Sequence, residues 1–248
     1  MQTIAEVITR LEDIIADCAS RNDRAGYFAV LYHRVTKRVA ECIANNEFED
    51  GARMELLDVL FASRYLEAYD GWRNRQRISA SWQLAFDAAA DNAPLVMQHL
   101  LLGINAHINL DLGIAGVETM KGYELKGIQK DFNDINNVLA GLVDVSQRCL
   151  IKVNPLLKLL QLHRQKYDEM LVQFSINTAR EGAWQFAQEL NGKTGQAYTD
   201  CIASRDVAIT VLGRTVARPK ARLLRLTIRL IQLFERKNVK DIIRLLGE

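Results

Sequence analysis

The chain has 248 residues, of which 49% are hydrophobic and 25% are charged. This balance is that of a folded globular protein and excludes an intrinsically disordered chain. The small net charge of +2 hides an uneven distribution, because residues 214–248 carry ten Lys or Arg against three Asp or Glu. This C-terminal part is therefore basic, at +7, and the rest of the chain is acidic, at −5.

Helical periodicity begins with the first residues of the chain. Three prolines and fourteen glycines leave room for long helices and few tight turns. Apolar residues at three- and four-residue spacing predict a first helix near 4–15, and a second is expected over 27–45. Asp50 is the expected N-cap of a third helix that ends near Gly71, and Ser79 that of a fourth helix through Ala90.

The second half of the chain is also predicted to be helical. Pro94 is expected in the first turn of a helix. Further helices are predicted over 124–150, from the pair Asn154-Pro155 to Leu190, and at about 194–212, 219–235 and 238–247, the last capped by Asn238. The chain shows no internal repeat and no linker long enough to separate domains. The prediction is an all-α, single-domain bundle of about ten helices over 1–248, with a basic amphipathic part at about 214–248.

No segment resembles a targeting signal or a membrane span. Charged residues interrupt the first twenty positions, where a signal peptide needs an uncharged apolar stretch. No uncharged apolar run is long enough to cross a bilayer. The cysteines stand singly and form no C-x-x-C pair: Cys18, Cys42, Cys149 and Cys201. They are interpreted as reduced core thiols, so we expect a cytoplasmic protein.

Polar and apolar residues alternate strictly from Ile104 to Leu112, which is a strand pattern. No other part of the chain offers a strand partner, and a lone strand leaves its backbone groups without hydrogen bonds. A buried helix whose polar side chains face an internal site is therefore the preferred interpretation. On such a helix four residues fall along one stripe: His99, Gly103, His107 and Asp111.

This stripe is the candidate functional centre. His107 and Asp111 have the four-residue spacing at which one helix gives a metal two ligands. His99, about 12 Å from His107 by helical rise, is a candidate further ligand or general base, and Gly103 would leave space between the two imidazoles. A satisfied hydrogen-bond network without a metal fits the same residues and remains open.

Several segments carry a resemblance: FED…LLDVLFASRYLEAY from Phe48, Trp82, QHLLLGINAHINLDL at 98–112, DFNDINNVL at 131–139 and REGAW at 180–184. Together they resemble an uncharacterised bacterial and fungal family, the domain of unknown function 5995, over about 26–235. The resemblance implies an all-helical protein and brings no established reaction. The motif positions that it singles out are Asp50, Asp58, Tyr65, Asn105, His107, Asp111, Asp131, Asn136, Arg180 and Trp184.

A metal-dependent hydrolase of an ester or phosphoester is the first functional hypothesis, with zinc or iron held by His107, Asp111 and His99. The helical zinc-dependent phospholipase C and nuclease superfamily is faintly similar in spacing, but this chain has Gly103 where that motif has an aspartate. The candidate catalytic residues are His99, Asn105, Asp131 and Arg180. The candidate residues for binding a small-molecule ligand or substrate are His33, Asp58, Tyr65 and Asn109. Among charged residues of the third helix, Arg64 could supply a guanidinium.

The second hypothesis is a non-catalytic helical protein that binds a small apolar ligand or a protein partner. In that case the polar stripe is structural. The motifs H-E-x-x-H, G-x-x-x-x-G-K-[ST], G-x-G-x-x-G and G-x-S-x-G are all absent, so the enzymes that they mark find no support.

Residues 218–234 predict a basic amphipathic helix. One stripe holds Arg218, Arg222, Arg225 and Arg229, and the apolar side holds Leu223, Leu226, Leu230, Ile231, Leu233 and Phe234. We expect the apolar side to pack on the protein's own core and the arginines to lie in water. Peripheral contact with an anionic membrane is the alternative. Nucleic acid is not expected as a partner, because aromatic residues are not interleaved with the charges.

Overall fold

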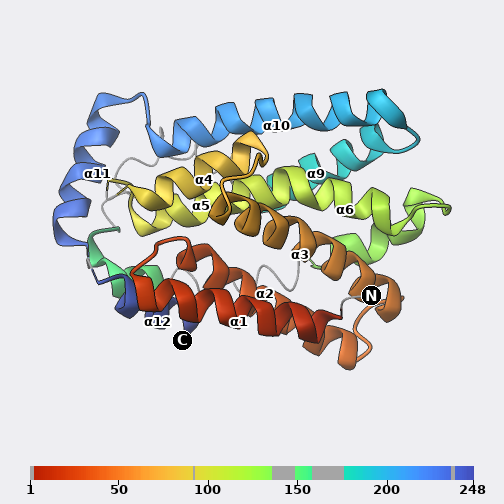
Figure 1. Ribbon diagram of the computed structural model, residues 1–248, viewed down its shortest axis with the longest axis horizontal. Helices are drawn as coiled ribbons and strands as arrows, with labels where there is room; N and C mark the ends of the chain where they lie inside the picture. The colour runs from red at the N-terminus through yellow and green to blue at the C-terminus, as the bar shows by residue number, and fades with distance from the viewer. Residues whose placement is uncertain (1–2, 92, 136–148, 158–175, 236–237) are drawn as a thin grey trace.

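Ten α-helices and no strand are found in the computed structural model, which describes residues 3–91, 93–135, 149–157, 176–235 and 238–248. The predicted all-α, single-domain bundle of about ten helices is confirmed. Most helices run along the long axis of the molecule, and one, α11, lies across its end (Figure 1).

Four helices form the first part of the bundle: α1 (Ile4–Arg21), α2 (Gly26–Ala44), α3 (Gly51–Arg73) and α4 (Ala80–Ala90). Two predicted caps are confirmed, since Asp50 accepts a hydrogen bond from the Arg53 N–H and Ser79 from the Trp82 N–H. Such caps satisfy donors that the first turn of a helix leaves unpaired. The predicted boundaries of α2, α3 and α4 therefore match closely, although α3 continues two residues past Gly71, whereas α1 continues to Arg21, beyond the predicted 4–15.

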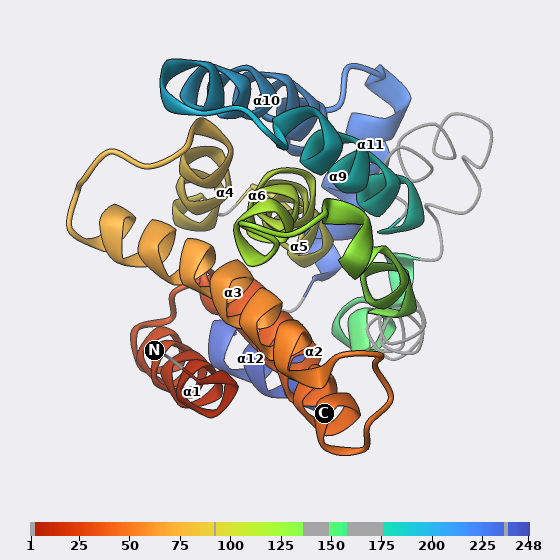
Figure 2. The same cartoon turned by 90° about the vertical axis from the view of Figure 1, so that its right-hand side faces the viewer.

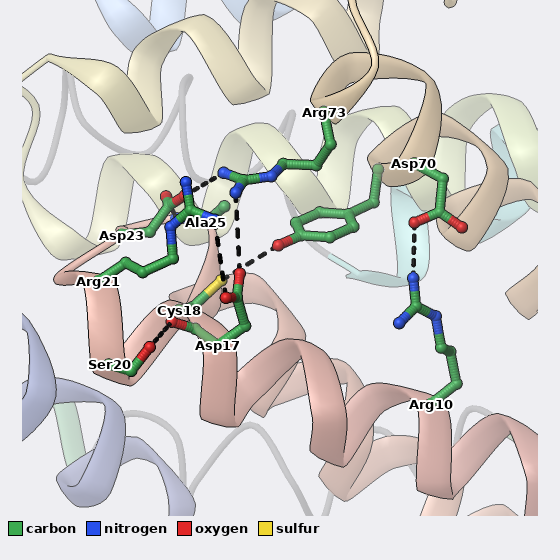
Figure 3. A network of polar contacts seen from close by, with 10 residues as sticks. Arg10, Asp17, Cys18, Ser20, Arg21, Asp23, Ala25, Asp70 and Arg73 are labelled. Carbon is green, nitrogen blue, oxygen red and sulfur yellow. Dashed lines mark hydrogen bonds and ion pairs between the residues drawn. The ribbon is translucent and has the colours of Figure 1, made fainter.

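Ion pairs link α1 and its end to α3 (Figure 3). Arg10 lies 2.7 Å from Asp70, and Arg73 lies 3.2 Å from Asp23. These side chains are partly exposed, and ion pairs of this kind contribute little free energy. The buried apolar face of α1, which includes Leu11, provides most of the attraction.

The centre of the bundle is one continuous helix made of α5 (Val96–Ala106), the π-helical turn η1 (His107–Asp111) and α6 (Leu112–Thr119). The helices α2, α3, α4, α9 and α10 pack around it (Figure 2). Among the described residues, this stretch is the one helix long and apolar enough to cross a membrane, and most of it is buried inside the bundle. The core helix of a bundle can be as long and as apolar as a membrane-spanning helix. The helix begins at Val96, so Pro94 lies just before it rather than in its first turn.

The second part of the bundle contains η2 (Leu125–Ile128), α9 (Ile176–Leu190), α10 (Gly195–Ala217), α11 (Arg222–Phe234) and α12 (Val239–Gly247). Asn238 caps α12 as predicted, and α12 packs against α1 and α2. The predicted helices over 124–150 and 154–190 are described in part, as helical turns over 125–135 and 149–153 and as α9. The motif position Asn136 lies outside the described residues.

The central helix and α2 approach closely at Gly103. A Cβ atom at this position would lie 2.3 Å from Cδ2 and 2.6 Å from Cγ of the Phe28 ring. Those distances are far inside van der Waals contact, so the two helices could not keep this separation with any larger residue at 103. Gly116, further along the same helix, is different, because its Cβ would meet a single atom of Phe132 at 3.8 Å.

We predict that Gly103→Ala lowers the free energy of unfolding by about 1–3 kcal/mol, because the added methyl group overpacks the core. Gly116→Ala is the matched control, and it should be neutral or stabilising by up to about 1 kcal/mol, since alanine favours a helix over glycine. Denaturant unfolding of both variants measures the difference. Equal stability of the two variants would contradict the packing at Gly103.

Candidate functional site

The π-helical turn brings His107 and Asp111 together. The N–H of Leu112 bonds to the carbonyl of His107, five residues back, which widens the turn. Residues four apart lie on the same face of a helix, and they remain neighbours in this turn. Nδ1 of His107 is 3.2 Å from Oδ2 of Asp111. A π-helical turn is rare and often marks a functional position, so this pair is the natural starting point.

Asp111 is a buried carboxylate with donors from two further helices. Nε1 of Trp82, on α4, donates to Oδ2 at 2.8 Å, and Nε of Arg64, on α3, donates to Oδ1 at 3.0 Å. Only 1% of the Asp111 surface is exposed. A buried charge requires such partners. Both carboxylate oxygens are therefore engaged within the protein.

His107 lies in an aromatic cage. The ring of Phe61 stacks on it at a centroid distance of 3.5 Å, and Tyr32 meets it edge-on at 4.4 Å. Burial lowers the pKa of His107, although the neighbouring Asp111 acts in the opposite direction. Because a carboxylate can only accept, Nδ1 of the neutral ring carries the proton. Nε2 has no hydrogen-bond partner among the described residues.

A second polar pair occupies the opposite side of the same helix. Nδ2 of Asn105 donates to the carbonyl of Ile209 on α10 at 2.8 Å, and Nδ2 of Asn109 donates to Oδ1 of Asn105 at 3.0 Å. Arg205, also on α10, donates to the backbone carbonyl of Asn109. Asn105 and Asn109 thus fasten the central helix to α10.

These two pairs explain the strict alternation of the sequence. His107 and Asp111 face α3 and α4, while Asn105 and Asn109, offset by two residues, face α10. Two residues correspond to about half a turn, so the pairs lie on opposite sides and produce a period of two on a helix. The predicted helix is confirmed over the strand.

His99 is separated from His107. It lines a cavity of about 20 Å³ together with Arg24, Phe28, Trp82, Phe86 and Gly103. The Phe28 ring lies against Gly103 and also contacts His107, so the expectation of free space between the two imidazoles is wrong. Burial, followed by the charge of Arg24, lowers the pKa of His99 to about 4. The cavity has room for about one water molecule.

Asp131 and Arg180 each join segments of the bundle. Asp131 accepts hydrogen bonds from the N–H groups of Glu49 and Asp50, at the start of α3, and from Nη2 of Arg53 at 2.9 Å. Arg180, on α9, donates to the carbonyl of Phe132, and its guanidinium lies over the Phe132 ring. Burial lowers the pKa of Arg180 to about 10. The hydrogen bonds of Asp131 are thus made at the start of α3, whereas those of Asp111 come from Arg64, Trp82 and His107.

The remaining candidates are dispersed. His33 pairs with Glu12 of α1 at 3.1 Å, rather than joining His107. Tyr65 packs into the aromatic cage, where its hydroxyl has no hydrogen-bond partner within the described residues. Asp58 is buried on α3, and its Oδ2 likewise has no partner in the described part of the chain. Trp184 packs on Phe132.

Among the described residues, the expected zinc or iron site lacks a complete set of ligands. A zinc site has three or four protein ligands, and no three His, Cys, Asp or Glu side chains within the described ranges come together in a way that could hold a metal. Moreover, His107 and Asp111 bond to each other and to Arg64 and Trp82. Both oxygens of Asp111 and Nδ1 of His107 are thus already bonded within the protein, and only Nε2 of His107 is left without a partner among the described residues.

Sequence reasoning missed part of this network. Trp82 and Phe61 are not among the candidate site residues, and Arg64 is predicted as a possible source of a guanidinium without its partner Asp111. The one signal for the cage is the recurrence of aromatic residues at helical spacing, as in Phe28 and Tyr32 or Phe61 and Tyr65. Such spacing indicates a buried face without saying what it surrounds.

Comparison with known proteins identifies the family. Residues 4–219 match a family of unknown function (DUF5995), and the chain therefore belongs to that family. No curated protein and no solved structure matches the chain. The matched residues include the whole network around Asp111 and end before α11 and α12.

Asp58 provides a test of the site's electrostatics. Burial, with a smaller contribution from Glu55, raises its pKa to about 7. The folded protein then holds a proton that the unfolded chain releases near pH 4, so this residue's contribution to stability falls as the pH rises from about 4 to about 7. Asp58→Asn removes that dependence.

We predict that, between pH 5 and pH 8, the wild type loses about 2 kcal/mol more unfolding free energy than Asp58→Asn does. Denaturant unfolding at the two pH values measures this difference. Asp13→Asn, which changes an exposed aspartate, should follow the wild type. A pH profile of Asp58→Asn parallel to that of the wild type would be inconsistent with a buried, protonated Asp58.

Proposed function

We propose that this protein is a non-catalytic helical binding protein whose buried polar residues hold the bundle together. The observation that carries the proposal is the enclosure of Asp111 among donors from within the protein. Its two oxygens accept from Arg64, Trp82 and His107, all in a buried environment. A carboxylate that acts directly on a substrate or a water molecule must have an open side, and Asp111 is only 1% exposed.

The size of the cavity supports a partner at the surface rather than a small ligand inside. Sites for drug-sized molecules have volumes of roughly 300–1,000 Å³, whereas the cavity beside His99 has about 20 Å³. It lies next to His99 and Gly103 and is not lined by His107. For the described part of the chain, a partner on the surface therefore fits better than a small apolar ligand inside.

The metal-dependent hydrolase remains a prediction with a clear requirement. Arg64 and Trp82 would have to release Asp111, and Phe61 would have to leave the face of His107, before a metal and a substrate could enter. Releasing a buried carboxylate from its donors is strongly unfavourable, by about 3–5 kcal/mol. The geometry therefore favours the binding protein.

Metal analysis separates the two functions. We predict that protein purified without a histidine tag contains far less than one equivalent of zinc or iron, and that His107→Ala leaves this content unchanged. His33→Ala is the matched control, because His33 is partly exposed and pairs with Glu12, away from Asp111. A full equivalent of metal that is lost in His107→Ala and retained in His33→Ala would contradict this proposal and support a metal site at His107.

A further inference from the structure

The helix α11 is apolar on two sides. Its inner side holds Leu224, Ile228 and Ile231, which are buried against Leu95 and its neighbours. Five large apolar side chains are exposed: Leu223 (62%), Leu226 (60%), Leu230 (46%), Leu233 (73%) and Phe234 (64%). The expectation that these residues pack on the protein's own core is wrong, and of the six predicted apolar residues only Ile231 is buried.

The exposed residues form a continuous stripe. At 100° per residue, the five side chains fall within an arc of about 100° on the helix. The inner residues lie on nearly the opposite side. The helix is held firmly by that inner side, because Nδ2 of Asn154 donates to the carbonyl of Ile231 and the carboxylate of Glu235 accepts from the N–H of Val96. The stripe therefore faces outward on an anchored helix.

A row of arginines borders the stripe along one edge. Arg222, Arg225 and Arg229 are exposed and occupy an adjacent arc of about 60°. None of the three forms an ion pair with another described residue, and α11 contains no acidic residue. Figure 1 shows that α11 lies across one end of the bundle, so the stripe and the arginines form an end face of the molecule.

We propose that this end face binds the surface of an anionic lipid bilayer. Leucine and phenylalanine side chains can enter the boundary between headgroups and acyl chains, while a flanking row of arginines contacts acidic headgroups. The +7 charge of residues 214–248 is attracted to an anionic surface, and the −5 charge of the remainder directs the rest of the molecule away from it. This inference rests on the proposed function and specifies the partner.

Two other occupants fit less well. A second copy of the chain would place one exposed arginine row near another, with no acid on α11 to separate the charges. A nucleic acid would contact the arginines but would leave the leucine stripe exposed, because α11 offers no aromatic side chains interleaved with its charges. Both remain outcomes that the experiment can detect.

Co-sedimentation of the full chain with vesicles is the test. We expect binding to vesicles of phosphatidylcholine mixed with phosphatidylserine, little binding to phosphatidylcholine alone, and weaker binding as salt rises. Each arginine near an anionic leaflet contributes about fivefold to affinity, so the triple variant R222Q/R225Q/R229Q should bind about 100-fold more weakly. Leu226→Ser with Leu230→Ser should lower affinity at least about tenfold.

Matched control variants remove the same charge or the same kind of apolar surface at positions outside α11. Lys37, Arg75 and Arg77 are exposed, and replacing all three by Gln removes equal charge. Val207 and Val211 are exposed on α10, and replacing both by Ser removes apolar surface. Neither control should change vesicle affinity by more than about twofold. Far-UV circular dichroism checks the fold, and the arginine variant decides the question if the leucine variant does not fold.

Three results would overturn the proposal. They are recovery in the supernatant with both kinds of vesicle, equal losses in the controls, and a dimer that dissociates in the leucine variant without any vesicle binding. The proposed function and the lipid proposal would be contradicted by different results. A bound metal would overturn the structural role of His107 without altering vesicle binding, whereas absence of vesicle binding would remove the lipid partner and leave the metal analysis unaffected.

Discussion

The structure depends on a carboxylate buried at the centre of the bundle. Asp111 is enclosed by apolar and aromatic side chains, and a charge in such surroundings needs several donors. The donors come from α3 (Arg64), from α4 (Trp82) and from the central helix itself (His107). Satisfying this one group therefore fixes where two outer helices meet the central one and favours the π-helical turn that brings His107 beside it.

The asparagine pair completes the same design on the other side. Asn105 and Asn109 bond to each other and to α10, so the central helix has polar attachments on opposite sides and apolar contacts elsewhere. Apolar packing alone would tolerate small rotations of a helix that is buried all round, whereas paired polar groups select one orientation. This role in specificity is a hypothesis for this protein, in line with the use of buried polar residues in other folds.

The sequence predicts what is determined locally. The caps at Asp50, Ser79 and Asn238 and the spacing of His107 and Asp111 involve residues within one turn, so their geometry follows from helical periodicity. Arg64 and Trp82 lie 47 and 29 positions from Asp111, and no local pattern indicates which distant donor reaches a buried acid. Periodicity also cannot orient α11, because both sides of that helix are apolar. Which side of α11 faces the core is decided by Leu95 and residues near 156, because they pack on only one side of that helix.

The central claim is that Asp111 stabilises the fold. The most direct measurement is the free energy of unfolding of Asp111→Asn, with Asp87→Asn, an exposed aspartate, as the control. Because both Asp111 oxygens accept hydrogen bonds, the asparagine amide would point a donor at Arg64 or Trp82. We expect Asp111→Asn to lose about 2–4 kcal/mol and the control to change by less than about 0.5 kcal/mol. An Asp111→Asn protein as stable as the wild type, or more stable, is what replacing a strained catalytic residue produces, and it would contradict this account.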